Sequence, residues 1–260
     1  MISKAALKEV RALKEKKYRQ DQKLFLVEGF RLVQEAVSSE FPVDMILFTA
    51  EFSKSTDHQK FLEALAKKRL RLEEVSSKEI KTISDTVTSQ GVLAVVHQKV
   101  WTLQKVFEQK KEHQIVVGLD AISDPGNLGT LLRTCDWFAA DLLLLGRRTV
   151  EVYNPKVVRS SMGAIFHVPV IENVDLDTTL PELRKRSFSI LVTDLTGETF
   201  HYDVRVPQKT VVVLGNEAWG VRTSLMAMAD ARVRIKGYGR AESLNVSVAC
   251  GVILSVLRSY

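Results

Sequence analysis

Residues 235–260, IKGYGRAESLNVSVACGVILSVLRSY, form the unit around which the fold of this chain is organised. A strand expected at 231–235 runs into a glycine-containing turn, and an apolar helix is expected at 243–258. Ser243, Asn245 and Ser247 stand where that helix begins. Serine and asparagine accept backbone N–H bonds at a helix start, so capping explains one of them. Three such residues exceed the need of one cap, which makes them candidates for a binding site as well.

The helix that follows is apolar on nearly every side, a pattern typical of a helix buried all round. One face repeats at spacings of three and four, and we expect it to pack on the chain's own sheet. This face consists of Leu244, Val248, Gly251, Val252 and Ser255. A second face is available to a partner, although full burial within one subunit would give the same sequence. The second face consists of Val246, Ala249, Cys250, Ile253, Leu254 and Leu257.

Two further stretches place polar residues directly after apolar strands. Residues 124–135, DPGNLGTLLRTC, begin with turn-forming residues, and a helix is expected with Asn127 at its start and Arg133 further along. Residues 211–220, VVVLGNEAWG, end a strand and bring Glu217. A purely structural interpretation makes Asn127 a helix cap, Arg133 a surface charge and Glu217 an acid in a first helical turn. However, ligands of parallel sheets bind at the carboxyl ends of strands, where all three stretches begin.

DPGNLGTLLRTC, LGNEAWG and SLNVSVA, in this order, resemble the three motifs of the SpoU (TrmH-type) RNA ribose 2′-O-methyltransferases of the SPOUT class. The resemblance covers the chain from about residue 114 to its end. It implies an α/β SPOUT domain with a C-terminal knot, S-adenosylmethionine as cofactor, RNA as substrate and a homodimer paired through the knot region. Residues 3–97 are more loosely similar to the substrate-binding domain that precedes many SpoU domains, a small ribosomal-protein-like α/β fold.

The same resemblance implies roles for individual residues. Asn127 and Arg133 would lie at the target ribose and its phosphate, and Glu217 would be a further active-site residue. Ser243 and Asn245 would line the site beside the transferring methyl group. Cofactor contacts, largely from the main chain, are implied for Thr193, Leu214, Gly215, Ile235 and Leu244.

The reaction itself restricts what these residues do. A ribose hydroxyl is a very weak acid, so a base or strong charge stabilisation is needed, and the 2′-oxygen must be held about 3 Å from the methyl group. The motifs contain neither histidine nor lysine. A guanidinium resists deprotonation but grips phosphate in a planar, two-pronged way. We therefore interpret Arg133 as a phosphate clamp that also stabilises the developing alkoxide, with Asn127, Ser243 and Asn245 fixing the ribose.

Composition sets the broad class. The chain has 260 residues, of which 45% are hydrophobic and 26% charged, and its net charge of +6 favours an anionic partner such as RNA. Cys135 and Cys250 have apolar neighbours, which favours buried, reduced thiols over a disulfide. No Cys/His set has zinc-ligand spacing, so no metal is expected. The N-terminus is charged and no apolar run approaches the roughly 20 residues that span a bilayer, so we expect a cytoplasmic protein without membrane association.

The order of elements predicts two α/β domains, residues 1–98 and 114–260, joined by a linker at 99–113. In the first domain the alternation of strands and helices indicates a largely parallel sheet, and residues 3–18 are expected to form one basic helix. Residues 1–23 carry eight basic side chains against three acids, which fits either a solvated helix face or a phosphate-contacting surface. The second domain is expected to be a doubly wound sheet, with strands at 115–119, 141–145, 167–171, 188–193, 210–214 and 231–235.

Two other functions remain to be separated from RNA methylation. A nicotinamide-dependent dehydrogenase would share the sheet, and Gly237 and Gly239 mimic part of its fingerprint. However, Glu242 replaces the third glycine, and the motif ends the chain instead of opening a βαβ unit. A non-catalytic RNA-binding protein is the stronger rival, although it would have no reason to keep the motif residues together. We prefer ribosomal RNA as substrate, because a domain of this sort often accompanies rRNA enzymes; transfer RNA and a role in antibiotic resistance stay open.

Overall fold

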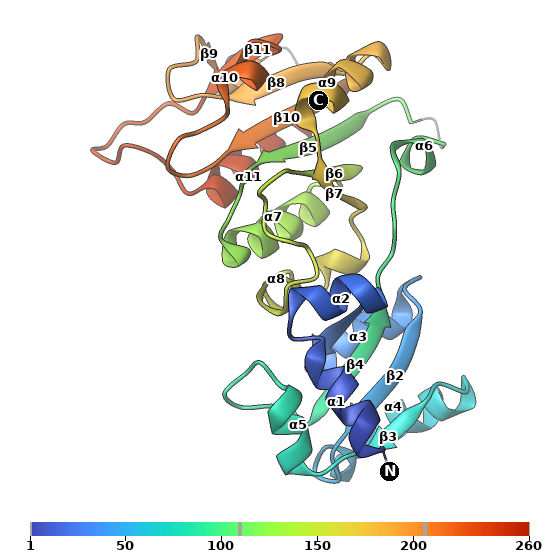
Figure 1. Cartoon of the computed structure of the whole chain (residues 1–260). Coiled ribbons are helices and arrows are strands. Elements are labelled where there is room, and N and C mark those ends of the chain that lie inside the picture. Colours follow the sequence, from blue (N-terminus) through green and yellow to red (C-terminus); the bar gives the residue numbers. More distant parts are fainter. Residues whose placement is uncertain (1, 109–110, 205–206, 260) are drawn as a thin grey trace. The chain divides into compact units, whose positions relative to one another are not determined.

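The computed structural model describes residues 2–108, 111–204 and 207–259, so parts of the predicted linker and the chain ends lie outside the described residues. The chain divides into two compact units, each with its own sheet (Figure 1). The first unit consists of Met1–Lys99 and Tyr153–Phe166, and the second of Val100–Val152 and His167–Tyr260.

The first unit is built on a four-stranded sheet of order β1-β4-β2-β3. Strand β4 inserts between β1 and β2 and runs antiparallel to both, while β2 and β3 are parallel. The expectation of a largely parallel sheet is therefore wrong for this unit, because alternating strands and helices do not fix where the last strand enters the sheet. The strands are β1 (Leu24–Glu28), β2 (Val43–Phe48), β3 (Leu72–Glu74) and β4 (Val92–His97). The helices are α1 (Lys4–Ala12), α2 (Lys16–Gln22), α3 (Phe30–Ser38), η1 (Phe52–Lys54), α4 (Thr56–Lys67), α5 (Ser77–Ile83), α8 (Pro155–Ser160) and η2 (Ala164–Phe166).

The basic N-terminal segment forms two helices, α1 and α2, instead of the single helix expected at 3–18. Arg19 is buried, and its Nη1 donates to the carbonyl oxygens of Leu13 and Lys14 at 2.7 Å each, which closes the turn between the helices. Lys14 also turns inward, with Nζ 2.8 Å from the carbonyl oxygen of Ser84. Arg19 and Lys14 therefore stabilise the fold and are not part of an outward basic surface.

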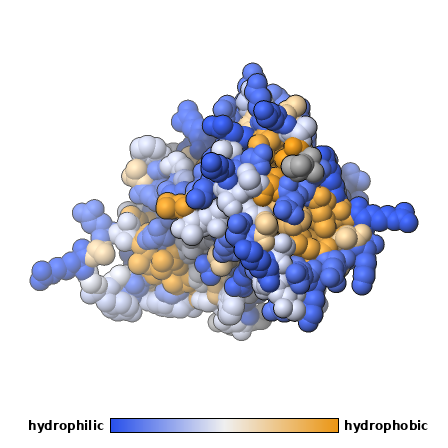
Figure 2. Space-filling model, turned by 90° about the horizontal axis from the view of Figure 1, so that it is seen from below, coloured by the Kyte–Doolittle hydropathy of each residue, from blue (hydrophilic) through white to orange (hydrophobic). Residues whose placement is uncertain are grey.

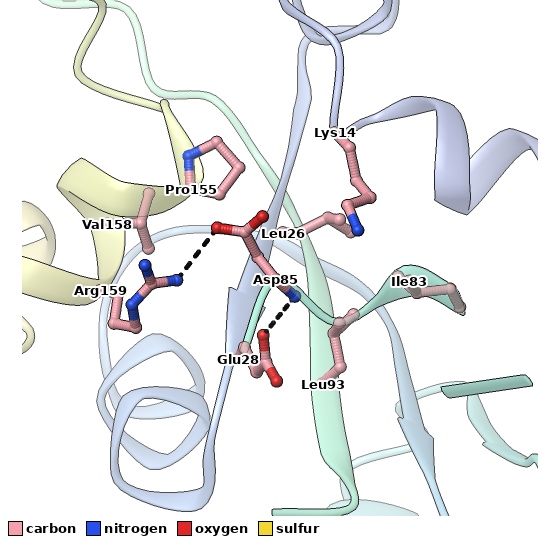
Figure 3. Close-up of a pocket in the computed structure, with 9 residues that line it drawn as sticks. All are labelled: Lys14, Leu26, Glu28, Ile83, Asp85, Leu93, Pro155, Val158 and Arg159. Atoms are coloured by element: carbon pink, nitrogen blue, oxygen red, sulfur yellow. Dashed lines mark hydrogen bonds and ion pairs between the residues drawn. The ribbon is translucent and has the colours of Figure 1, made fainter. Parts of the chain in front are cut away.

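Helix α8 belongs to the first unit although its sequence lies in the stretch assigned to the second domain. Figure 3 shows the small pocket where it joins: Arg159 Nη1 lies 3.2 Å from Asp85 Oδ2, and the backbone N–H of Asp85 donates to Glu28 at 3.0 Å. The pocket is completed by Lys14, Leu26, Ile83, Leu93, Pro155 and Val158. The sequence does not indicate that α8 packs in the first unit, because its apolar pattern fits packing on either sheet.

The second unit is a seven-stranded sheet of order β7-β6-β5-β10-β8-β11-β9, and its pairings are parallel. This confirms the α/β fold with a parallel sheet, and β9 adds an edge strand that the sequence did not predict. The strands are β5 (Gln114–Asp120), β6 (Leu142–Gly146), β7 (Val170–Val174), β8 (Ser189–Thr193), β9 (Thr199–Phe200), β10 (Lys209–Gly215) and β11 (Ala231–Arg234). The helices are α6 (Leu103–Val106), α7 (Pro125–Trp137), α9 (Leu176–Lys185), η3 (His201–Asp203), α10 (Thr223–Met226) and α11 (Val246–Leu257).

The strand order places the site. Strands β5, β10, β8 and β11 are consecutive neighbours in the sheet, and because they are parallel their carboxyl ends lie along one edge. The first motif stretch follows β5, the second ends β10 and the third follows β11. Three segments that are far apart in sequence therefore meet at one edge of this sheet.

Helix α11 packs on α7 and also contacts β10 and η3. Its buried side is formed by Val246, Cys250, Ile253, Leu254 and Leu257. Val248 is 52% exposed and Ser255 is exposed as well. The expectation is thus reversed: the face through Val248 and Ser255 does not pack on the chain's own sheet, and the opposite face does. The helix is also not buried all round, contrary to the expectation. Because its residues are apolar on every side, the sequence does not indicate which side faces the core.

Cys135 on α7 and Cys250 on α11 are both buried and form no disulfide, as expected. A hydrogen bond with Cys250 and burial raise the pKa of the Cys135 thiol well above its ordinary value. Cys135 therefore stays protonated at neutral pH and does not act as a nucleophile.

The exposed surface is mixed. On the face drawn in Figure 2, apolar side chains gather in patches among protruding hydrophilic ones. The large apolar side chains that are most exposed include Val87, Trp137, Trp219 and Tyr238. Within the described residues no helix is long and apolar enough to cross a bilayer, and no group of His, Cys, Asp or Glu side chains is placed to hold a metal ion.

Candidate active site

Asn127 lies in the first turn of α7, at the carboxyl end of β5. Asp124 is the cap of this helix, because its Oδ1 accepts the backbone N–H of Asn127 at 2.8 Å. The capping role considered for Asn127 therefore belongs to Asp124, and the Asn127 side chain is directed to other partners.

A hydrogen-bond network joins side chains from all three motif stretches. Asn127 Nδ2 donates to Glu217 Oε1 at 2.5 Å, and Asn245 Nδ2 donates to Asn127 Oδ1 at 2.9 Å. Ser247 Oγ donates to the backbone carbonyl of Asn127 at 3.1 Å. The structure thus brings Asn127, Glu217 and Asn245 together, and each amide nitrogen keeps a second N–H for a ligand.

The polar residues at the start of α11 have different roles. Asn245 is the cap, since its Oδ1 accepts the backbone N–H of Ser247 at 2.9 Å, while its Nδ2 contacts Asn127. Capping and participation in the network are therefore combined in one side chain. Ser243 is exposed and has no hydrogen bond to this network in the described part of the chain.

Arg133 lies almost two turns beyond Asn127 on α7 and is exposed. Within residues 2–108, 111–204 and 207–259 it makes no ion pair, and it is not joined to the three-motif network. It shares the exposed side of α7 with Thr130 and Trp137. Its guanidinium is available to an anion from outside the chain.

The second motif stretch forms a tight backbone loop. Asn216 and Gly220 exchange backbone hydrogen bonds of 3.1 and 2.8 Å, and Asn216 Nδ2 donates to the carbonyl oxygen of Ala121 at 2.8 Å. A Cβ on Gly215 would lie 2.1 Å from the carbonyl carbon of Gly220. Glycine is needed at 215 because the chain's own backbone occupies the space that a side chain would fill.

An ion pair that the sequence did not reveal joins the end of this loop to the end of β5. Arg222 donates to the buried carboxylate of Asp120 through its backbone N–H at 3.0 Å and through Nε at 2.9 Å, and Nη1 lies 3.0 Å from Asp177. Burial lowers the pKa of Arg222, but the hydrogen bond and the charge of Asp120, helped by Asp177, outweigh it and raise the pKa. The sequence features that could have indicated this ion pair are the aspartate at the end of β5 and the arginine two residues after Gly220.

The residues expected to hold the cofactor lie at neighbouring strand ends. Thr193 ends β8, and its Oγ1 donates to the carbonyl oxygen of Val213 at 3.2 Å. Leu214 and Gly215 end β10, Ile235 directly follows β11, and Leu244 is 48% exposed just before α11. Main-chain groups at strand ends and the exposed apolar side chain of Leu244 suit a ligand that combines polar groups with an aromatic base. These residues therefore fit S-adenosylmethionine.

Residues 114–255 match the model of the SpoU rRNA Methylase family, and residues 4–94 match the MRM3-like substrate binding domain. The chain belongs to the SpoU rRNA methylase family. This confirms the family that the three motifs predicted, and with it the prediction that the protein is an RNA methyltransferase.

This SpoU methylase is similar over most of its length to two relatives that are named as rRNA methyltransferases and to a solved structure. It is 31% identical to the 23S rRNA (guanosine(2553)-2′-O)-methyltransferase RlmP of Bacillus subtilis, with 97% of this chain and 95% of the relative aligned. It is 31% identical to the 23S rRNA (guanosine-2′-O-)-methyltransferase RlmB of Neisseria meningitidis, over 89% and 94% of the two chains. The structure of the SpoU methyltransferase AviRb from Streptomyces viridochromogenes with the cofactor AdoMet matches with a TM-score of 0.87 and 26% identity, over 99% and 98% of the chains.

Proposed function

We propose that this SpoU methylase methylates the 2′-hydroxyl of a ribose in ribosomal RNA. The observation that carries the proposal is the network of Asn127, Glu217 and Asn245, which assembles polar groups from three motifs at the strand ends. Two relatives that align over nearly the whole chain are named as 23S rRNA 2′-O-methyltransferases, which supports rRNA over tRNA. We also propose a cytoplasmic location, where this substrate would be found.

The cofactor is S-adenosylmethionine, which supplies an activated methyl group when bound. The proposed task of the protein is to place the ribose 2′-oxygen against that group. Asn127 and Asn245 each have a second N–H that can donate to ribose oxygens, and their mutual hydrogen bond fixes the direction of both amides. Glu217 orients Asn127 by accepting its first N–H. Ser243 is proposed to line the same site.

Arg133 is proposed to bind a phosphate of the substrate and to stabilise the negative charge that develops on the 2′-oxygen. Its exposure and its lack of an ion pair in the described residues support this role, because a guanidinium already neutralised by a carboxylate would be a weaker clamp. A guanidinium stays protonated near neutral pH, so the proposed role is electrostatic and not that of a base.

The function can be tested with purified components. We expect the protein to bind S-adenosylmethionine with micromolar affinity in isothermal titration, and to transfer its methyl group to deproteinised rRNA as 2′-O-methylated ribose. Absence of both binding and transfer would favour a non-catalytic RNA-binding role. Transfer to tRNA but not to rRNA would support the alternative substrate.

We propose that the first unit, predicted as residues 1–98, binds the RNA substrate. Its match to a substrate-binding domain supports this. Lys4, Lys8 and Arg11 recur at helical spacing on the exposed side of α1, and Lys16 and Lys17 are exposed on α2. This outward set differs from the one expected from the sequence, since Lys14 and Arg19 are used inside the fold.

Replacing Lys16 and Lys17 with alanine should weaken RNA binding and lower its salt dependence, because each lysine that binds a phosphate releases counterions. We expect the slope of log K against log salt to fall by about one for each lysine that binds a phosphate in the wild-type complex. Binding of S-adenosylmethionine should not change. Replacing Lys60 and Lys67 on α4 removes the same charge from the same unit and serves as the control. If the two double variants had equal slopes of log K against log salt, Lys16 and Lys17 would be ordinary solvated side chains that bind no phosphate.

We also propose that the second units of two copies pair as a homodimer, and that the C-terminal segment is knotted. Helix α11 contacts both α7, which follows β5, and η3, which follows β9. The last helix therefore packs against segments that follow two separate strands, which supports this proposal. The proposed contact surface is the α7–α11 face, where a Cβ on Gly251 would lie 3.7 Å from Thr134 and the two helices adjoin. Exposed apolar side chains of this kind are typical of interaction sites. The face consists of Thr134, Trp137, Val248, Val252 and Ser255.

Changing Val248 to glutamate should convert the dimer into a monomer in sedimentation equilibrium and weaken S-adenosylmethionine binding, since α11 begins beside Leu244 and Asn245. Val248 is the right position because it is 52% exposed, whereas Ile253 and Leu257 are 3% and 4% exposed, so a charge there would disrupt the core instead. Val87→Glu, on a fully exposed side chain of the first unit, is the matched control. A wild-type monomer that binds the cofactor normally would refute both the dimer and its coupling to the site.

A further inference from the structure

Strand β9 is one edge of the second sheet, and β11 is its neighbour (Figure 1). A group of aromatic and cationic side chains lies on and just after these two strands. Arg234 Cζ lies 4.2 Å from the ring centroid of Phe200, and Lys236 Nζ lies 5.6 Å from it. Lys236 Nζ also lies 5.2 Å from the ring centroid of Tyr238. The Tyr202 ring is stacked on Phe200, with centroids 5.4 Å apart and planes 12° apart. We call Phe200, Tyr202, Arg234, Lys236 and Tyr238 the aromatic–cation cluster.

A structural role explains only part of this cluster. Phe200 pairs with Arg234 across the two strands, so their contact helps to hold the two-residue strand β9 in place. Tyr202 is 45% exposed and its ring covers part of Phe200, whereas Tyr238 is 84% exposed, so the Tyr238 ring buries little apolar surface. Tyr238 in particular has one charged neighbour and otherwise faces solvent.

The cations of the cluster are not neutralised. In the described residues neither Arg234 nor Lys236 makes an ion pair, and Arg234 Nε is buried without a hydrogen-bond partner. Two acids that precede β9 are engaged elsewhere, because Arg232 lies 3.5 Å from Asp194 and 3.6 Å from Glu198. Positive charge beside exposed aromatic rings is a combination that binds both the phosphate and the base of an unpaired nucleotide.

The position of the cluster relates it to the proposed catalytic site. Ile235, proposed to contact the cofactor, stands between Arg234 and Lys236 in the sequence. The loop that carries Lys236 and Tyr238 continues to Asn245 in the three-motif network. An RNA strand whose ribose lies at Asn245 would therefore pass close to this loop.

We propose that the aromatic–cation cluster binds an unpaired base and its phosphate in the RNA strand beside the target nucleotide. This inference rests on the proposed function, and it specifies that the substrate is single-stranded at that point. The bases of a duplex are stacked on each other and do not offer a free face to Tyr238, whereas bases in loops and bulges do. Stacking on an aromatic ring tolerates any base, so the cluster supplies affinity rather than sequence choice.

The test uses the full-length protein with Tyr238→Ala and Tyr238→Phe. We expect Tyr238→Ala to weaken binding of a short single-stranded oligouridylate by about tenfold, with little effect on a duplex of equal length, and to raise the KM for rRNA similarly with kcat nearly unchanged. Tyr238→Phe keeps the ring and should retain wild-type binding. Lys236→Ala should lower the salt slope by about one. Leu195→Ala, which removes an exposed apolar side chain outside the cluster, is the control.

Several results would overturn the proposal. Equal oligouridylate binding and rRNA KM for wild type and Tyr238→Ala would do so, as would a loss that is as large for the duplex as for the single strand. A variant that loses S-adenosylmethionine affinity instead would assign Tyr238 to the cofactor site, and one that loses only the dimer would assign it to an interface. A wild-type protein that methylates no ribose would refute the proposed function itself, which distinguishes the two failures.

Discussion

Replacing Arg133 with alanine is expected to abolish methyl transfer while leaving S-adenosylmethionine affinity nearly unchanged. Arg133 is exposed on α7 and lies outside the hydrogen-bond network that joins the three motifs, so its removal should not disturb that network. Loss of one preorganised donor to a developing negative charge costs about a hundredfold to a thousandfold in kcat, and weaker binding of the phosphate adds to this. Single-turnover methylation of rRNA and isothermal titration with S-adenosylmethionine measure the two effects separately.

Two further variants sharpen this prediction. Arg133→Lys should not restore much activity, because an ammonium group is a point charge that cannot form the planar, two-pronged contact. Arg186→Ala removes an exposed arginine that pairs with Glu182 and precedes the amino end of β8, away from the motif edge, and should behave as wild type. Near-wild-type turnover by Arg133→Ala would remove Arg133 from the mechanism.

Replacing Asn127 with alanine is expected to lower kcat by at least about a hundredfold, because it removes the residue that connects all three motifs. Glu217 would lose the hydrogen bond that it accepts from Asn127, and Asn245 would lose the oxygen to which its amide donates. These side chains are partly solvated, so water can take the place of the Asn127 amide, and we expect a stability cost of only about 1 kcal/mol. Thermal unfolding should therefore change little while activity falls steeply.

The control is Thr130→Ala, which lies one turn further along α7 and whose hydroxyl donates only to the carbonyl oxygen of Gly126. It should leave kcat close to the wild-type value. If Asn127→Ala and Thr130→Ala had equal activities, the hydrogen-bond network would stabilise the fold and would not contribute to catalysis. A fall in kcat that is matched by a large loss of stability would point to the same conclusion.

Much of the second unit follows from its sequence because its strands are uninterrupted apolar runs. The runs LLLL (residues 142–145) and VVVL (residues 211–214) fit strands of a sheet covered on both faces, and the parallel order of the strands brings the three motifs to one edge. The partners within the site are a different matter. The contacts of Asn127 with Glu217 and Asn245 join residues that are 90 and 118 positions apart. The strand ends and the resemblance to a family indicated one shared site, but they did not predict these contacts.

Other features were beyond the sequence for identifiable physical reasons. The apolar character of α11 on every side concealed that Val248 faces outward. The position of β4 between β1 and β2 depends on which edge of a growing sheet is open, which no local pattern encodes. Lys14 and Arg19 look like surface charges until the turn between α1 and α2 provides carbonyl groups for them. The pair of Asp120 and Arg222, separated by 102 positions, is of the same kind.

The most direct test of the central claim is mass-spectrometric mapping of ribose methylation in rRNA and tRNA from cells with and without this protein. We expect one 2′-O-methylated nucleotide of rRNA to disappear when the protein is absent. It should return with the wild-type protein and not with Arg133→Ala or Asn127→Ala. An rRNA methylation pattern that is the same in both cells, or a loss confined to tRNA, would contradict the proposed function.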